Sequence, residues 1–197
     1  MNSTYRIVLL DLGGVLLRLN DPCEIFDVGH NREQFLENWL HSPAVRSFEC
    51  GDIDAAHFSK TIVEELHLPY SAEEFMRRFD QWPDELYPGA ESLLKQLRES
   101  CETALLSNTN AVHRDGAGKQ LGRHVDHLFL SFQTGLLKPD KAIFEHALAH
   151  YSSDGSDVMF LDDNKTNVEA ARECGIESHQ TVGFDALLER LRESGLI

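Results

Sequence analysis

The stretch Ile7-Val8-Leu9-Leu10-Asp11-Leu12-Gly13-Gly14 decides how this chain is expected to fold. Its first four residues form a short, continuous apolar run, which is typical of a parallel strand covered on both faces. The run ends at Asp11, and the two glycines then supply a turn that other residues would resist. The chain therefore begins with a buried strand that presents a carboxylate at its carboxyl end.

Strand-like and helix-like segments alternate after Pro88-Gly89. We expect strands at residues 103–106, 127–131 and 158–161, a further strand after Gly175, and helices at 90–99, 140–151 and 184–194. Such alternation predicts an α/β fold with a doubly wound, Rossmann-like parallel sheet and right-handed crossovers. In these sheets ligands bind beyond the carboxyl ends of the strands, near the point where strand order reverses.

A helical insertion is expected to interrupt this core after its first strand. Between residues 18 and 85 the apolar residues recur at helical spacing, and Ser71-x-x-Glu74 has the form of a capping box. No segment of this region has the pattern of a strand. The expected domains are an α/β core at 1–17 and 86–197 and an α-helical cap at 18–85, with hinges near 15–19 and 86–89.

Charge and composition narrow the classes of partner. The 197 residues include 33 Asp and Glu against 18 Lys and Arg, which gives a net charge of −15. Such a chain repels nucleic acid and anionic membrane surfaces, so we expect neither as a partner. The apolar run at residues 7–17 is interrupted by Asp11 and is too short to span a bilayer. We expect a small-molecule ligand and a monomer or a weak homodimer.

The cysteines indicate the compartment. The four cysteines lie far apart in the sequence and form no C-x-x-C or zinc-like pair. Reduced, mostly structural thiols are therefore expected. With no targeting signal visible, a cytoplasmic protein is the expectation; the residues concerned are Cys23, Cys50, Cys101 and Cys174.

Three carboxylates are expected to converge at the carboxyl ends of two strands: Asp11, Asp162 and Asp163. Without compensation, such a cluster would force one or more of them to take up a proton. A hard divalent cation removes this conflict, and a site that keeps positions open for water and phosphate oxygen suits Mg²⁺. The cluster therefore predicts a magnesium site.

Residues suited to phosphate binding lie at the neighbouring strand ends. Lys138 can supply a fixed positive charge, and Ser107 and Asn108 offer a hydroxyl, an amide and backbone N–H groups. Taken singly, an aspartate after a strand is usually a helix cap, and Ser-Asn is ordinary turn chemistry. It is their joint order after apolar runs that indicates a phosphate-handling site.

Four stretches carry a resemblance to a known family. Asp11-Leu12-Gly13-Gly14-Val15-Leu16, Ser107-Asn108-Thr109-Asn110, Lys138-Pro139 and Phe160-Leu161-Asp162-Asp163-Asn164 resemble, in order, the four signature motifs of the haloacid dehalogenase (HAD) superfamily. The insertion is similar to the C1-type cap of that superfamily. Within it, the chain resembles bacterial sugar-phosphate phosphatases of the alpha-glucose-1-phosphate phosphatase kind and the N-terminal phosphatase domain of soluble epoxide hydrolases.

The resemblance implies a covalent, metal-dependent mechanism. Asp11 would attack phosphorus and form an aspartyl-phosphate that water then hydrolyses. Mg²⁺ would be held by Asp11, the backbone carbonyl of Gly13, and Asp163. Asp162 would be either a further ligand or a hydrogen-bonded partner of the ligands.

The resemblance also implies how the phosphoryl group is bound. Ser107, Asn108 and Lys138 would hold and neutralise it during transfer. Lys138 would in this way act in catalysis as well as in binding. Asn167 occupies a position where many relatives carry another acidic residue.

Gly13 is the main departure from the family pattern. Most phosphatases of the superfamily carry a second aspartate there, which protonates the leaving group and activates water. Without a side chain, acid–base help worth about 10²–10⁴-fold is absent at this position. Either a cap residue or water substitutes, or the substrate has a good leaving group, or catalysis is lost. We favour a good leaving group, as in an anomeric sugar phosphate or an acyl phosphate.

Two other functions fit part of the pattern. A haloacid-type dehalogenase would use the same Asp11 nucleophile without a metal, but the adjacent carboxylates Asp162-Asp163 would then be hard to explain. A catalytically inactive phosphate-binding regulator fits Gly13, yet binding alone does not require the nucleophile.

The histidines and the cap aromatic residues are expected to be structural. We interpret His113, His124 and His127 as surface groups or as core groups with satisfied hydrogen bonds. The large aromatic residues are expected to pack the cap core, with the alternative that one lines the substrate pocket; these are Trp39, Trp82 and Tyr87.

Overall fold

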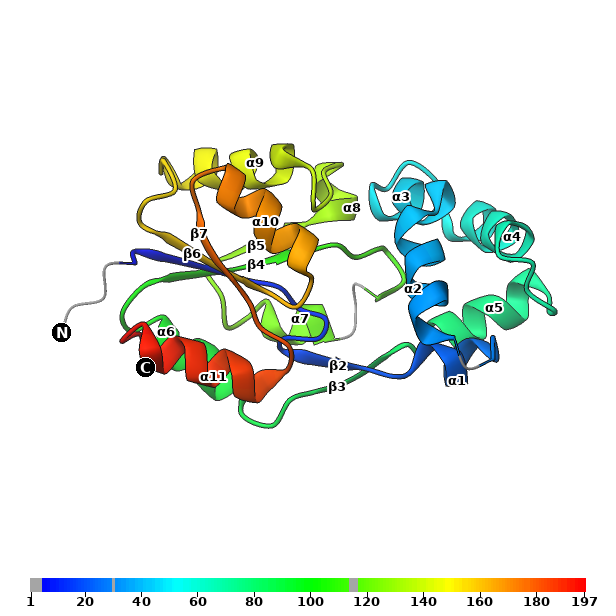
Figure 1. Ribbon diagram of the computed structural model, residues 1–197, viewed down its shortest axis with the longest axis horizontal. Coiled ribbons are helices and arrows are strands. Elements are labelled where there is room, and N and C mark those ends of the chain that lie inside the picture. The colour runs from blue at the N-terminus through cyan, green and yellow to red at the C-terminus, as the bar shows by residue number, and fades with distance from the viewer. Residues whose placement is uncertain (1–4, 30, 114–116) are drawn as a thin grey trace.

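The centre of the protein is a five-stranded parallel sheet with helices on both faces (Figure 1). The computed structural model describes residues 5–29, 31–113 and 117–197. The strand order is β5-β4-β1-β6-β7. The strands span Ile7–Leu10 (β1), Glu102–Ser107 (β4), His127–Leu130 (β5), Val158–Asp162 (β6) and Glu177–Gln180 (β7). The predicted α/β fold with a doubly wound parallel sheet is confirmed.

Strand order reverses beside β1, and this reversal determines where a ligand-binding site is expected. The chain moves from β1 to β4 and β5 on one side, then returns to β6 and β7 on the other. In the register, Leu10 lies opposite Leu105 and also opposite Leu161. The residues that follow these three positions therefore emerge at one edge of the sheet, where α/β proteins bind their ligands.

Alternating side chains of the strands form two apolar layers. Val8 and Leu10 pack with α6 (Ala90–Leu97), α7 (Ala117–Leu121) and α11 (Phe184–Glu193). Ile7 and Leu9 pack on the opposite face with α9 (Lys141–Tyr151) and α10 (Lys165–Glu173). All four β1 side chains are at most 1% exposed, and burial of each stabilises the fold by about 1.5–3 kcal/mol. The sheet edge that carries the polar residues thus rests on a rigid support.

Five helices form a separate body at one end of the sheet (Figure 1). They begin at good N-caps: the side chains of Ser42, Asp54 and Ser71 each accept a hydrogen bond from a backbone N–H. Their buried faces form an aromatic core, in which the Phe48 and Phe58 rings stack with centroids 4.2 Å apart. The helices span Pro22–Phe26 (α1), Arg32–His41 (α2), Pro43–Glu49 (α3), Ala55–Glu65 (α4) and Ala72–Phe79 (α5).

Two short strands connect this helical body, hereafter the cap, to the core. β2 (Leu17–Leu19) and β3 (Pro83–Leu86) pair antiparallel, so the prediction that no strand lies between residues 18 and 85 is wrong. The pattern gave no signal because each strand is only three or four residues long, and β3 carries Pro83, Asp84 and Glu85, which disfavour strands. The pairing makes the connection a two-stranded ribbon rather than two independent linkers.

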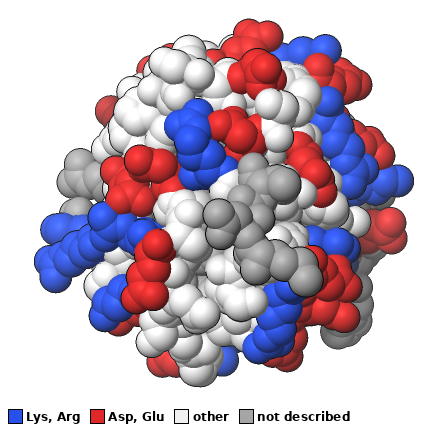
Figure 2. All heavy atoms as spheres, turned by 90° about the vertical axis from the view of Figure 1, so that its left-hand side faces the viewer, with Lys and Arg blue, Asp and Glu red and all other residues white. Residues whose placement is uncertain are grey.

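The end of the core remote from the cap has an ordinary charged surface. Ion pairs such as Arg6–Asp157 and Arg98–Asp126 lie at the amino ends of strands. Figure 2 shows this end of the molecule, with acidic and basic side chains beside one another. Exposed pairs of this kind contribute little stability. All four cysteines are free thiols, and within the described ranges no helix has the length and apolar character needed to cross a membrane.

Candidate active site

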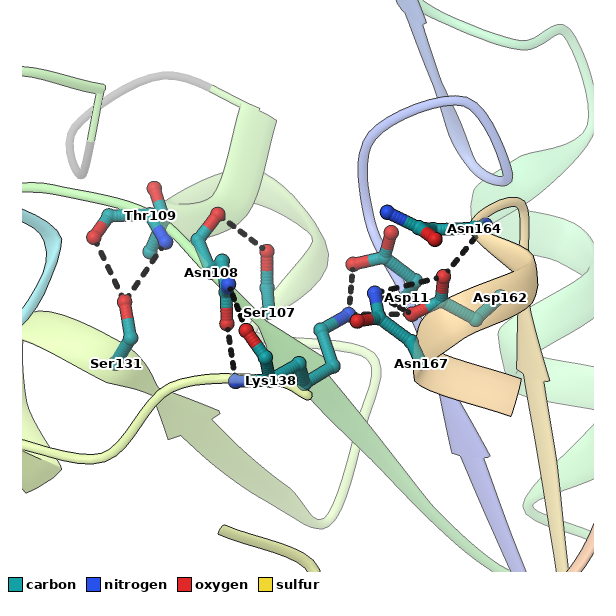
Figure 3. A network of polar contacts seen from close by, with 9 residues as sticks. All are labelled: Asp11, Ser107, Asn108, Thr109, Ser131, Lys138, Asp162, Asn164 and Asn167. Carbon is teal, nitrogen blue, oxygen red and sulfur yellow. Dashed lines mark hydrogen bonds and ion pairs between the residues drawn. The ribbon is translucent and has the colours of Figure 1, made fainter. Parts of the chain in front are cut away.

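The three predicted carboxylates meet at the carboxyl edge of the sheet. Figure 3 shows two of them, Asp11 and Asp162, beside the buried Lys138. Asp11 follows β1, and Asp162 and Asp163 lie at the end of β6. Carboxylate oxygens of all three lie within 4.8 Å of one another. The Lys138 Nζ lies 2.8 Å from Asp11 Oδ1 and 2.6 Å from Asp162 Oδ2. These four side chains are hereafter called the carboxylate cluster.

Electrostatics in the carboxylate cluster favour an additional cation. Burial and the neighbouring carboxylates raise the pKa of Asp11 to about 7, although Lys138 opposes the shift. Burial and Asp162 likewise raise the pKa of Asp163 to about 6. Burial alone would lower the pKa of the Lys138 ammonium, but its two carboxylate partners raise it above the ordinary value. Three carboxylates against one ammonium leave two negative charges, and hard oxygen donors of this kind suit a small divalent cation.

Asp162 is fully engaged with the protein. Its Oδ2 accepts from Lys138 Nζ, and its Oδ1 accepts from the Asn164 backbone N–H at 2.8 Å. The Asn167 amide donates to both oxygens at 3.0 and 3.1 Å. Asp162 is 0% exposed, whereas Asp11 and Asp163 are partly accessible. Of the two predicted roles for Asp162, these contacts favour orientation of Lys138 and of the α10 amino end over direct metal ligation.

Gly14 brings the turn after β1 against Asp163. Its φ of +71° lies in the left-handed region, and a Cβ there would sit 2.3 Å from Asp163 Oδ2. The turn is further fixed because Gly14 N–H donates to the Leu17 carbonyl and the Gly14 carbonyl accepts from Gly183 N–H. A glycine is therefore required for Asp163 to approach the turn that carries the Gly13 carbonyl.

Replacing Gly14 by Ala is expected to displace Asp163 from the carboxylate cluster. The added Cβ overlaps the carboxylate, and the φ value costs about 1–2 kcal/mol in a residue with a side chain. We expect Mg²⁺ affinity, measured by calorimetry, to fall at least about tenfold. Gly195→Ala is the matched control, since Gly195 has φ +67° but no atom within 4 Å of its Cβ position. Equal Mg²⁺ affinity in both variants would contradict this assignment.

The loop after β4 holds Lys138 in place. The Asn108 side chain accepts from the Lys138 backbone N–H and donates to the Lys138 carbonyl, both at 2.9 Å. Ser131 at the start of α8 (Ser131–Thr134) makes two 2.9 Å hydrogen bonds to the Thr109 backbone. Ser107 is buried beside them, as Figure 3 shows. The amide of Asn108 therefore fixes the lysine, and its predicted contact with phosphate stays a prediction.

A cavity of about 300 Å³ lies between the core and the cap. Gly13 and Ser107 line it from the core, and Trp39 and Trp82 line it from the cap while also packing the cap core. Tyr87 is not among the described lining residues and instead stacks on Phe184. The remaining described lining residues are Leu12, Leu17, Leu19, Glu49, Phe79, Asp80, Pro83, Asp84, Asn108, Thr109, Asn110, Val112, His113 and Leu130.

Two histidines interpreted as structural have identifiable partners. His113 lines the cavity, its Nε2 lies 2.9 Å from the Phe79 carbonyl, and burial lowers its pKa below the ordinary value. It therefore ties the loop after β4 to the cap. His127 is not among the described lining residues, and its ring contacts that of His150 of α9, with centroids 3.9 Å apart.

Glu49 is a cavity residue that sequence patterns did not indicate. It is the last residue of α3, and no motif includes it. Burial raises the pKa of its carboxyl to about 8, Lys138 opposes this shift, and Asp11 adds to it. The carboxyl therefore shares the electrostatic field of the carboxylate cluster although it belongs to the cap.

Comparison with known proteins agrees with this geometry. Residues 5–175 match the family model described as haloacid dehalogenase-like hydrolase. The chain belongs to this family. The predicted family resemblance is thereby confirmed, and the carboxylate cluster lies where this hydrolase fold presents its strand ends.

Relatives of this haloacid dehalogenase-like hydrolase include phosphatases. It is 25% identical to the D-ribitol-5-phosphate phosphatase of Bacteroides thetaiotaomicron over 88% of this chain and 90% of the relative. It is 28% identical to a sesquiterpene phosphatase of Aspergillus oryzae, over 89% of each. A HAD family enzyme of B. thetaiotaomicron, solved in complex with magnesium and inorganic phosphate, superimposes with a TM-score of 0.73 at 26% identity, covering 90% of this chain and 94% of that one.

Proposed function

We propose that this protein is a Mg²⁺-dependent phosphatase that hydrolyses a small phosphate monoester through an aspartyl-phosphate on Asp11. The observation that carries the proposal is the carboxylate cluster: the partly accessible Asp11 carboxylate is held 2.8 Å from a buried ammonium group, beside the cavity that the next two residues of the chain line. Pure binding of phosphate would not require a carboxylate there, because two anions repel each other.

Asp11 supplies the nucleophile, and its surroundings prepare it for attack. An Asp11 oxygen would form a bond to phosphorus while the bond between phosphorus and the leaving oxygen breaks. Lys138 keeps the carboxylate oriented and neutralises charge on the transferring group. Water would then attack phosphorus, break the bond to Asp11 and release inorganic phosphate. Asp162 keeps Lys138 extended toward this site through its 2.6 Å ion pair.

A magnesium ion fits the donor set at this position. Asp11, the Gly13 backbone carbonyl and Asp163 are the residues that would hold it, with Asp162 acting through its hydrogen bonds. When bound, Mg²⁺ supplies positive charge that offsets the two excess negative charges and the charge of the phosphoryl group. The HAD family relative that binds magnesium and inorganic phosphate supports this choice of metal.

The cavity indicates the class of leaving group. Its described lining contains Glu49, Asp80 and Asp84 but neither Lys nor Arg, so a second anionic group on the substrate would be repelled. Apolar walls from both the core and the cap favour an uncharged organic group of modest size. The core provides no acid at Gly13, and a phosphate that leaves easily depends least on an acid, so we propose a substrate of this kind, such as a sugar 1-phosphate. The named substrates of the relatives, a pentitol phosphate and sesquiterpene phosphates, are uncharged apart from phosphate.

Mg²⁺ is expected to stabilise the protein at neutral pH and much less at pH 5. The Asp11 and Asp163 carboxyls hold protons up to pH about 7 and about 6 in the folded chain, against an ordinary value of 3.8. Between the ordinary value and these raised values, the metal-free folded protein therefore binds more protons than the unfolded chain. Its free energy of unfolding falls as the pH rises through this range. Mg²⁺ binds the deprotonated carboxylates and reverses the loss. Thermal denaturation with and without Mg²⁺ at pH 5 and 7.5 measures this; an equal increase in Tm at both values would contradict it.

A panel of phosphate esters, assayed with and without Mg²⁺, tests the proposed activity. We expect Mg²⁺-dependent release of phosphate, faster from anomeric and acyl phosphates than from simple alkyl phosphates. Faster hydrolysis of the alkyl esters would overturn the leaving-group argument. Metal-independent release of halide from haloacids would favour the dehalogenase alternative, and binding of phosphate without turnover would favour the regulator. We also propose a cytoplasmic monomer or weak homodimer.

A further inference from the structure

Glu49 is a cavity carboxylate that neither the fold nor the proposed nucleophile explains. Within the part of the chain that the structure describes, its side chain has no hydrogen bond and no ion pair, whereas Asp11, Asp162 and Lys138 are all paired. The residue is only partly exposed, and a carboxylate held in a cavity without a partner is unfavourable, so it is rarely kept for packing alone. We therefore expect the Glu49 carboxyl to have a function inside the cavity.

Two contacts fix α3 against the core on either side of Glu49. Three residues before it, the Arg46 guanidinium pairs with Asp140 in the loop that follows Lys138. Two residues after it, Gly51 adopts φ +79° and approaches α8 so closely that a Cβ would lie 2.6 Å from the Phe132 carbonyl. Figure 1 shows α3 as the cap helix beside α8. The residue between these contacts is thereby held over the strand ends of the core.

The charged groups around Glu49 favour its protonated form. The carboxylate cluster supplies Asp11, which repels a second negative charge, and Lys138, which attracts it. Elsewhere on the cavity wall Asp80 and Asp84 are acidic, and Asp84 is paired with Arg18 at 3.2 Å. Burial and Asp11 outweigh Lys138 and raise the Glu49 pKa to about 8. A carboxyl that changes protonation near neutral pH can both donate and accept a proton during turnover.

The core side of the cavity lacks an acid at residue 13. Gly13 lines the same cavity, and a Cβ at this glycine would meet only the end of the Leu19 side chain, at 3.4 Å. Residue 13 therefore has no side chain that could carry a proton, and the space beside it borders the apolar Leu19 side chain. Of the acidic residues described in the cavity lining, Glu49 is the one whose charge interacts with that of Asp11.

We propose that Glu49, delivered by the cap, is the acid and base that the core lacks at Gly13. The proposal rests on the phosphatase activity proposed above. As Asp11 bonds to phosphorus and the ester bond breaks, the leaving oxygen takes the proton of Glu49. The resulting carboxylate then takes a proton from the water that attacks phosphorus, and the Asp11–phosphorus bond breaks to release inorganic phosphate. One ester and one water give one alcohol and one phosphate, and Glu49 regains its proton.

A leaving-group series with Glu49→Gln tests the assignment. Gln keeps the size of the side chain but can neither donate nor accept the proton. For alkyl phosphates we expect kcat/KM to fall by about 10²–10⁴-fold. For acetyl phosphate, whose leaving group needs no proton, kcat/KM should change less than about threefold, because this ratio reports steps up to its departure. With acetyl phosphate the variant should also accumulate phosphorylated Asp11, since the water step lacks its base.

Two further variants separate this role from a structural one. Glu65→Gln removes a carboxylate from the exposed surface of α4 and should leave the leaving-group dependence unchanged. In the Glu49→Gln background, Gly13→Asp should restore alkyl phosphate hydrolysis at least about tenfold, because it returns an acid to the core side of the cavity. A uniform loss across all leaving groups, or no loss, would overturn the role of Glu49. Absence of phosphatase activity in the unmodified protein would instead refute the proposed function.

Discussion

Replacing Asp11 by Asn is expected to lower kcat for every phosphate substrate by roughly 10⁴-fold or more. The amide has the size of the carboxylate but is a poor nucleophile toward phosphorus, so the covalent step is lost rather than slowed. The variant should still bind phosphate, because Lys138 and the loop after β4 are unchanged. Steady-state assays with acetyl phosphate, together with calorimetric titration of phosphate, measure both effects.

Stability distinguishes this loss from misfolding. The Asp11 carboxyl has a pKa of about 7 because burial and two neighbouring carboxylates disfavour its charge. A neutral amide relieves that repulsion, while Lys138 keeps its ion pair with Asp162. We therefore expect the free energy of unfolding of Asp11→Asn at pH 7.5 to equal or exceed that of the unmodified protein. Activity that survives in a folded variant would refute the covalent mechanism.

Replacing Lys138 by Met is expected to cost both activity and stability. Its ammonium group is 1% exposed and pairs with two carboxylates, one of them 0% exposed. Removal of one partner from a buried ion pair leaves uncompensated charge, which typically costs about 3–5 kcal/mol. The loss should be largest above pH 7 and smaller at pH 5, because protonation of the carboxylates relieves the repulsion. Urea denaturation at the two pH values gives the comparison.

An exposed lysine provides the control for this variant. Lys141 pairs with Glu173 at 3.0 Å, but both side chains are more than half exposed. Lys141→Met should change the free energy of unfolding by less than about 1 kcal/mol, with little dependence on pH. If the two lysine variants were equally stable, the buried network around Lys138 would not hold the site together.

Residues at strand ends could be predicted because sheet geometry determines where they lie. A buried apolar run indicates a parallel strand, and parallel strands bring their carboxyl ends to one edge, so Asp11 and Asp162 had to approach each other. The glycine turn after β1 was also visible in the sequence. The structure adds its reason, which is the close approach of Gly14 to Asp163.

Contacts between the cap and the core could not be predicted from local patterns. The β2 and β3 strands are too short for a period of two to be distinctive, β3 is also polar, and they form because they pair with each other. Glu49 has the sequence context of an ordinary helix end. The docking of α3 through the Arg46–Asp140 ion pair and through Gly51 places it in the cavity. The use of both ends of the Asn108 amide by Lys138 is likewise a tertiary contact, 30 residues apart in sequence.

Trapping the covalent intermediate tests the central claim most directly. The protein is mixed with acetyl phosphate and Mg²⁺, quenched in acid within one turnover, digested, and analysed by mass spectrometry. We expect one phosphoryl group on the peptide that contains Asp11, and none when Mg²⁺ is omitted. Hydrolysis that proceeds while this peptide stays unmodified, or with the phosphoryl group on another residue, would contradict Asp11 as the nucleophile.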